Sequence, residues 1–171
     1  MNSKIKKLAG KIDLVITDVD GVLTDGGRYF SVDGEKLKKF HVRDGMAVNI
    51  LLRNKIKTII LTKEKSRITK KWAKDMNVTE VFSGFTDKEK ALELISKKYK
   101  HSIKNMAYIG DDVNDLQVLS NVGFSGVPND AVFQAKKIAD YVCENKGGEG
   151  CFREFSELIL LSKFASKTKW Y

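Results

Sequence analysis

The apolar positions of the chain form a regular pattern, in which short continuous apolar runs alternate with longer stretches of helical spacing. Three clear runs and two weaker ones predict β-strands at 12–18, 57–62, 105–111, 122–127 and 139–143. The stretches between them predict helices at about 44–54, 65–76, 87–99, 112–120 and 130–137, with a short strand between the second and third helices. Short buried strands that alternate with amphipathic helices are typical of βαβ units. We therefore expect an α/β fold built on a Rossmann-like, doubly wound parallel sheet.

Two segments depart from this alternation. Residues 26–42 resemble two strands around Asp33-Gly34, a dipeptide that favours a tight turn, so we expect a β-hairpin insertion there. A glycine-rich stretch precedes an apolar helical pattern near the end of the chain, which predicts a C-terminal tail and helix over 146–171. No linker, repeat or change of composition divides the chain, and we expect one domain over 1–171.

Composition narrows the class of protein. The chain has 171 residues, of which 42% are hydrophobic, yet no apolar run approaches the ~20 residues of a membrane span. The first residues lack the apolar stretch of a signal peptide, so we expect a cytoplasmic protein without membrane contact, and reduced thiols at Cys143 and Cys151. The net charge of +9 comes from lysines spread along the chain. This favours a solvated surface that attracts anionic ligands over a nucleic-acid interface.

Polar side chains gather at the carboxyl ends of the predicted strands. Asp18 and Asp20 follow the first strand, Thr62 ends the second, and Asp111 with Asp112 follows a later one. Ligands of open α/β sheets bind at these strand ends. Two carboxylates one residue apart repel each other unless a cation compensates them, and Mg²⁺ takes oxygen ligands and often shares them with a phosphate. The alternative is an ordinary acid pair in a solvated turn.

Other positions also have plain structural explanations when taken singly. Asp111, Asp112 and Asp115 are suited to the first turn of a helix, where acids complement the helix dipole. Taken alone, Thr62 could be an ordinary hydroxyl residue at the end of a strand, and Lys88 an ordinary surface lysine. The order of these residues along the chain is more informative than any one of them.

That order, acid-x-acid, Thr, Lys and then Gly-Asp-Asp-x-x-Asp, resembles the haloacid dehalogenase superfamily of phosphotransferases over about residues 12–155. The resemblance implies that Asp18 is the nucleophile and Asp20 the acid and base. Thr62 and Lys88 would stabilise the transferring phosphoryl group. The implied cofactor is Mg²⁺, and the resemblance also implies which residues bind it and which residues support the site. Asp18, Asp111 and the Asp20 carbonyl would bind the metal, Asp112 would support its ligands, and Asp115 would hold Lys88.

The chain has no room for the cap domain that covers the active site in many of these relatives. Its motifs resemble a capless branch, the 3-deoxy-D-manno-octulosonate 8-phosphate phosphatases and the 2-keto-3-deoxy-nononate or acylneuraminate 9-phosphate phosphatases. The motifs that carry the resemblance are TDVDGVLTDG, FHVRDG, GDDVNDL, GVPNDA and KGGEGCFRE. The resemblance implies a homotetramer whose neighbouring subunits act as caps, with the 26–42 hairpin and the tail at the interfaces.

The two residues after Thr62 indicate which substrate to expect within the class of anionic sugar phosphates. The octulosonate enzymes typically have Thr-Gly-Arg there, and the nine-carbon branch commonly has a glutamate in place of the arginine, whereas this chain has Thr62-Lys63-Glu64. We therefore expect a nine-carbon ulosonate 9-phosphate, with the eight-carbon 8-phosphate as the alternative. Lys63 fits neither pattern. The family resemblance also favours substrate contacts for Arg43, Asp44 and Arg153, although each suits a helix end or a surface.

Two functions of other classes compete with this interpretation. A phospho-accepting receiver domain also combines acids, Mg²⁺, Thr and Lys, but its acceptor aspartate lies at a later strand end than its paired acids. A phosphatase for nucleic-acid ends would explain the positive charge, but the sequence shows no clear basic track beside Asp18. An inactive interaction module is disfavoured because all the expected acids are present.

Overall fold

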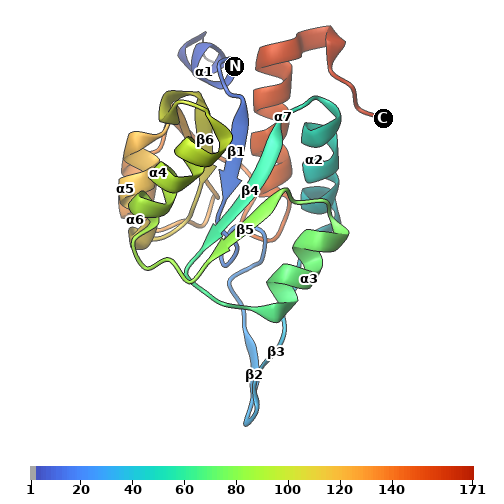
Figure 1. Cartoon of the computed structure of the whole chain (residues 1–171), viewed down its shortest axis with the longest axis vertical. Coiled ribbons are helices and arrows are strands. Elements are labelled where there is room, and N and C mark those ends of the chain that lie inside the picture. Colours follow the sequence, from blue (N-terminus) through green and yellow to red (C-terminus); the bar gives the residue numbers. More distant parts are fainter. Residues whose placement is uncertain (1–2) are drawn as a thin grey trace.

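The computed structural model describes residues 3–171, so that residues 1 and 2, at the start of the expected domain, lie outside it. A parallel sheet forms its centre, with the strand order β5-β4-β1-β6-β7-β8 (Figure 1). The strands are β1 (Leu14–Thr17), β4 (Lys57–Thr62), β5 (Glu80–Ser83), β6 (Met106–Ile109), β7 (Phe124–Val127) and β8 (Tyr141–Val142). The chain enters at the central strand β1, builds one side of the sheet and then crosses to the other. The crossing creates a switch point at the carboxyl ends of β1, β4 and β6, which is where such sheets bind ligands.

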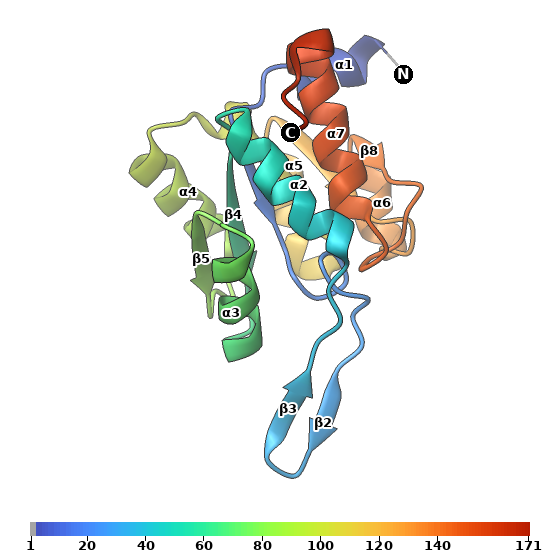
Figure 2. The same cartoon turned by 90° about the vertical axis from the view of Figure 1, so that its right-hand side faces the viewer.

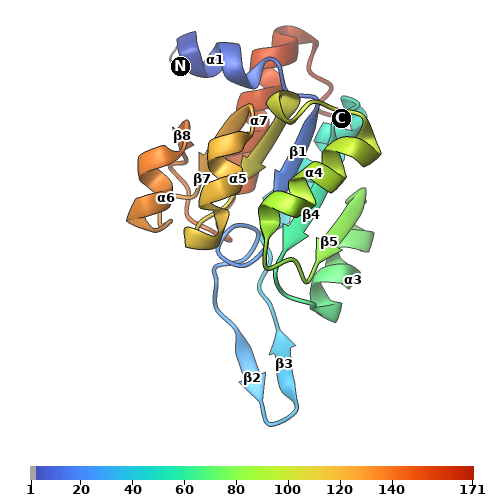
Figure 3. The ribbon, with the colours of Figure 1, turned by 60° about the vertical axis from the view of Figure 1, so that its left-hand side comes forward.

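Helices cover both faces of this sheet. One face carries α1 (Ser3–Ala9), α2 (Val42–Arg53), α3 (Arg67–Asp75) and α7 (Cys151–Phe164). The other carries α4 (Lys88–Tyr99), α5 (Leu116–Asn121) and α6 (Phe133–Ile138) (Figure 3). Along β1, Val15 packs into the first core, while Leu14 and Ile16 pack into the second. Both faces of the strand are buried, which explains why it is continuously apolar rather than alternating. The expected doubly wound α/β fold is confirmed.

A β-hairpin projects from the carboxyl edge of the sheet, between β1 and α2 (Figure 2). Its strands are β2 (Tyr29–Ser31) and β3 (Gly34–Leu37), and Ser31 pairs with Gly34. The turn is therefore Val32-Asp33, one residue earlier than expected. Gly34, with a φ of +103°, takes the left-handed conformation at the start of β3. The hairpin insertion itself is confirmed, and within residues 3–171 no segment forms a separate cap.

Helix α1 is the one α-helix of the described residues that the sequence did not predict. Its seven residues are too few to be stable alone. The helix lies against α7, where Ala9 is fully buried, and this tertiary contact stabilises it. The expected helix at 112–120 is also divided, into a 3₁₀ turn at Val113–Asp115 followed by α5. Within the described part of the chain, no helix is both long and apolar enough to cross a membrane.

Candidate active site

The loop that follows β1 holds the first two acids. Asp18 donates its backbone N–H to the Ile109 carbonyl at 3.0 Å, and its Oδ1 accepts the backbone N–H of Val19 at 2.7 Å. The chain then turns at Gly21, which has a φ of +86°. A Cβ at Gly21 would lie 2.0 Å from Oδ2 of Asp111. Glycine is therefore required at this position both by the backbone conformation and by the close approach of the second acidic loop.

Lys88 connects the two acidic loops from the start of α4. Its Nζ lies 2.6 Å from Oδ2 of Asp18 and 2.6 Å from Oδ1 of Asp115, and all three side chains are buried. Burial opposes the charge on Lys88, but the two carboxylates outweigh this effect and raise the pKa of Lys88 above its ordinary value. The ammonium group is therefore held permanently charged beside Asp18.

Asp115 organises this part of the site. Its Oδ2 accepts the backbone N–H groups of Asp111 and Asp112 at 2.9 and 3.2 Å, and its Oδ1 binds Lys88. The hydroxyl of Tyr108 donates to the same Oδ1 at 2.5 Å and lies 3.1 Å from the Lys88 Nζ. The sequence analysis did not identify Tyr108. Its only signal was a phenol within an otherwise apolar strand, a group that needs a buried partner.

The acids at this strand edge are suited to a divalent cation. Oxygen atoms of Asp18, Asp111 and Asp115 lie within 4.8 Å of one another. Burial, and then the charges of Asp18, Asp115 and Asp112, raise the pKa of Asp111 to about 8. Burial also raises the pKa of Asp18 to about 6, against the opposing effect of Lys88. A cation would relieve this crowding of carboxylates, and a hard ion with oxygen ligands such as Mg²⁺ fits the donor set.

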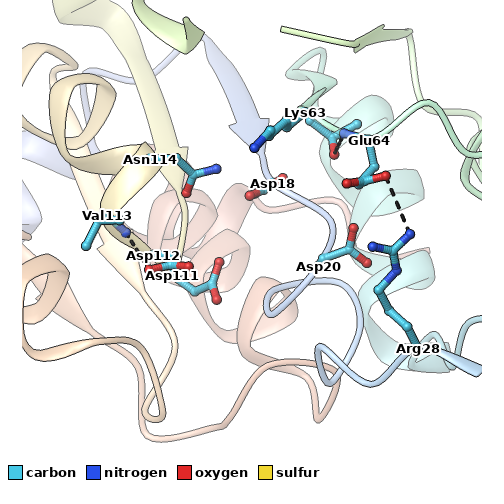
Figure 4. A pocket seen from close by; sticks show the side chains of 10 residues that line it. Asp18, Asp20, Arg28, Lys63, Glu64, Asp111, Asp112, Val113 and Asn114 are labelled. Carbon is cyan, nitrogen blue, oxygen red and sulfur yellow. Dashed lines mark hydrogen bonds and ion pairs between the residues drawn. The ribbon is translucent and has the colours of Figure 1, made fainter. Parts of the chain in front are cut away.

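An open pocket of about 370 Å³ lies over these acids (Figure 4). Its lining includes Asp18, Asp20 and Thr62, with the acidic loop on one side and the segment after β4 on the other. The further lining residues are Arg28, Lys63, Glu64, Asp111, Asp112, Val113 and Asn114. Predicted residues from three strand ends thus meet in one cavity. Lys88 lies beneath it, in contact with Asp18.

The side chain of Asp20 has a partner that the sequence did not reveal. Lys38, directly after β3, has a side chain without exposed surface, and its Nζ contacts Oδ1 of Asp20 and lies 3.1 Å from Oε1 of Glu35. Lys38 lies in a lysine-rich stretch that resembles a solvated strand, so the sequence provides no signal for this contact. The hairpin therefore contributes a charged group to the site.

Three predicted substrate contacts lie outside the pocket. Asp44 is buried in α2 and accepts the backbone N–H of Arg153 at 2.8 Å, so it caps the N-terminus of α7. Arg43 is exposed, and Arg153 pairs with Glu157 at 2.5 Å. Both arginines line a separate cavity at the start of α7. The structure does not bring these residues to the Asp18 pocket of the same chain, and a contact with a neighbouring subunit's site stays a prediction.

The glycine-rich segment before α7 supports the loop of Asp20 and Gly21. Gly148 donates its N–H to the Val22 carbonyl at 2.9 Å, and a Cβ at Gly147 would lie 2.0 Å from the Gly21 carbonyl oxygen. The two loops touch through their backbones, which only residues without side chains allow. The glycines of the C-terminal motif thus help to position the acidic turn.

Comparison with known proteins agrees with this geometry. The model of the haloacid dehalogenase-like hydrolases matches residues 29–154. The chain belongs to this family. It is 39% identical to the 3-deoxy-D-manno-octulosonate 8-phosphate phosphatase KdsC of Haemophilus influenzae over 149 residues, which are 87% of this chain and 83% of the relative. The Escherichia coli K12 enzyme of the same name is 37% identical over 155 residues, 91% and 82% of the two chains.

Solved structures resemble this phosphatase over nearly its whole length. The 3-deoxy-D-manno-octulosonate 8-phosphate phosphatase of Yersinia pestis superposes with a TM-score of 0.94 at 34% identity, over 96% of this chain and 89% of that one. The enzyme of the same name from Moraxella catarrhalis gives 0.92 at 32% identity, over 95% and 94%, and was solved with magnesium, phosphate and KDO. These matches cover more of the chain than the family model, which begins at residue 29, after the Asp18 loop.

Proposed function

We propose that this phosphatase hydrolyses the terminal phosphate of 3-deoxy-D-manno-octulosonate 8-phosphate. The observation that carries the proposal is the bridge formed by Lys88 between Asp18 and Asp115, at the floor of a pocket lined with acids. In this bridge the buried carboxylate of Asp18 lies next to the permanently charged ammonium group of Lys88, an arrangement that serves phosphoryl transfer. The eight-carbon substrate is supported by the named relatives, which align with most of the chain.

The positions of these side chains support the following chemistry. An oxygen of Asp18 attacks phosphorus, the bond from phosphorus to the sugar oxygen breaks, and Asp20 gives its proton to that oxygen. A water molecule then attacks phosphorus and Asp20 takes a proton from it, which releases phosphate and regenerates Asp18. Lys88 and the Thr62 hydroxyl stabilise the phosphoryl oxygens. Mg²⁺, held by Asp18, Asp111 and the Asp20 carbonyl, would supply positive charge to the transferring group.

A nine-carbon ulosonate 9-phosphate is the second candidate. It is favoured by Glu64, which lines the pocket where the octulosonate enzymes typically have an arginine. Phosphate release from both substrates, measured side by side with the purified protein, tests the two. A higher kcat/KM for the eight-carbon substrate supports the proposal, and a higher value for the nine-carbon substrate supports the alternative. Release from neither would overturn both.

The proposal includes a homotetramer that works in the cytoplasm. The pocket of one chain is open, and closure by a neighbouring subunit would exclude water and strengthen the electrostatic interactions within it. The hairpin exposes apolar side chains and unpaired strand edges, which are a liability in an isolated chain. Its exposed apolar residues are Tyr29, Phe30, Val32 and Leu37.

A further inference from the structure

Arg28, just before β2, places its positively charged guanidinium group at the pocket. Its side chain is 36% exposed and lines the same cavity as Asp18 and Asp20. Figure 4 shows its guanidinium group on the Asp20 side of the pocket, turned toward Glu64 and away from the acidic loop of Asp111. The sequence analysis did not identify Arg28, which precedes an exposed strand and matches no motif. Its position gives the pocket a cation that is separate from Lys88.

One edge of this guanidinium is fixed. Nε of Arg28 donates to Oε1 of Glu35 at 3.0 Å, and the group lies 4.8 Å from the centre of the Phe30 ring. Glu35 is itself held by Lys38 at 3.1 Å and by the Ser66 hydroxyl at 3.0 Å. These contacts orient the guanidinium without occupying its outer nitrogen atoms.

The other edge has only a weak partner. Nη2 of Arg28 lies 3.5 Å from Oε2 of Glu64, at the limit of a hydrogen bond, and the Glu64 side chain is 45% exposed. Exposed ion pairs of this kind contribute little free energy. A second carboxylate could therefore replace Glu64 at small cost, and the planar guanidinium would bind it through two parallel hydrogen bonds.

The charges around the pocket show why such a cation is needed. Its described lining has five acids, Asp18, Asp20, Glu64, Asp111 and Asp112, and two cations, Arg28 and Lys63. The ammonium group of Lys88 is already paired with Asp18 and Asp115. A 2-keto sugar acid phosphate carries a carboxylate at the end opposite its phosphate. That carboxylate needs a preoriented cation away from the acidic loop, and Arg28 has this position.

We propose that Arg28 binds the carboxylate of the substrate, and that Glu64 occupies the same guanidinium edge when substrate is absent. This inference rests on the proposed function, because it requires a sugar acid phosphate as substrate. Arg28 thereby selects acid sugars over neutral sugar phosphates. Glu64, once displaced, is free to accept hydrogen bonds from hydroxyl groups of the sugar.

The test compares Arg28→Met with Lys36→Met. The control removes one positive charge from the same hairpin, where Lys36 pairs with Asp33 in solvent. Each protein is assayed with octulosonate 8-phosphate and with p-nitrophenyl phosphate, which has no carboxylate. Arg28→Met removes the hydrogen-bonded ion pair proposed between Arg28 and the substrate carboxylate. This loss should lower kcat/KM for the sugar acid about 10- to 100-fold, mainly through KM. Arg28→Met should lower kcat/KM for p-nitrophenyl phosphate far less than for the sugar acid, and Lys36→Met should change neither activity.

Inhibition by product analogues gives a second measurement. Free octulosonate should inhibit p-nitrophenyl phosphate hydrolysis by the unmodified protein more strongly than its methyl ester does, and Arg28→Met should remove this preference. Equal losses on both substrates, or an unchanged KM and an unchanged preference, would overturn the assignment of Arg28 alone. Failure of the unmodified protein to hydrolyse eight- or nine-carbon ulosonate phosphates would overturn the proposed function and this inference together.

Discussion

The amino group of Lys38 contacts the carboxylate of Asp20 although the two residues lie on different elements, the hairpin and the loop after β1. Lys38 has no exposed side-chain surface, whereas the Asp20 side chain is 25% exposed toward the pocket. A buried ammonium group next to the expected acid and base restricts the position of that carboxylate. We therefore expect the hairpin to affect catalysis through Asp20.

We expect Lys38→Met to lower kcat/KM for p-nitrophenyl phosphate about 10- to 100-fold, because a misplaced acid or base loses part of its ~10²–10⁴-fold contribution. If Lys38 acts through Asp20, the same substitution should have almost no effect in an Asp20→Asn background. Lys39→Met, which removes an exposed neighbouring lysine, is the control. Independent, multiplicative losses in the double variant would contradict this positioning role.

Replacement of the nucleophile should abolish turnover. Asp18→Asn is expected to reduce phosphate release by at least about 10³-fold, because an amide oxygen does not form a stable phosphoryl intermediate. The fold should persist, since Lys88 keeps its contact with Asp115, and circular dichroism can verify this. Asp33→Asn at the exposed hairpin turn is a matched control. Retained activity in Asp18→Asn would refute the mechanism.

The acidic loop should bind Mg²⁺ in a way that thermal unfolding can detect. Chelation should remove activity and added Mg²⁺ should restore it, while saturating Mg²⁺ should raise the melting temperature of the unmodified protein. Asp111→Asn should weaken both effects, because Asp111 is an expected ligand. Asp112→Asn should weaken them less, since its Oδ1 accepts the Val113 N–H. A metal-independent enzyme would argue against this site.

Asp44 should make stability depend on pH. Burial raises the pKa of Asp44 to about 6, so the folded state holds this proton more tightly than the unfolded state does. The stabilisation that this tighter proton binding gives the folded state, at most roughly 3 kcal/mol, is fully present below pH ~4. It is lost as the pH rises through about 6. Asp44→Asn should reduce this loss of stability between pH 4 and 7 in denaturant titrations. An identical pH dependence in the variant would contradict the assignment.

The assembly can be tested at the hairpin. The double substitution Val32→Lys and Leu37→Lys replaces two exposed apolar side chains and should dissociate the proposed tetramer. Light scattering would then report a smaller particle, and phosphatase activity should fall because the pocket loses its cover. A fully active monomer, of either the variant or the unmodified protein, would refute the tetramer.

Several features of the fold were predictable because they depend on local patterns. The apolar runs predicted the strands, since β1, β4 and β6 are buried on both faces. The expected acids and Thr62 could be grouped because parallel strands place their carboxyl ends at one edge, whereas Lys88, at the start of α4, was selected through the family resemblance. The weaker strand at 139–143 exists but has only two residues, Tyr141 and Val142. Helix α1 escaped prediction because its stability comes from α7, far away in the sequence.

The sequence by itself determined which residue types stand at the strand ends, because strand periodicity is a local property, and the order of its motifs carries the family resemblance that implies a phosphoryl-transfer site. Only the tertiary structure decided which other side chains reach that site. Lys38 and Arg28 enter it because the hairpin folds beside the Asp18 loop, while Asp44 is turned away to cap α7. Such contacts join residues far apart in the chain. Their formation depends on how elements pack, which no local pattern encodes.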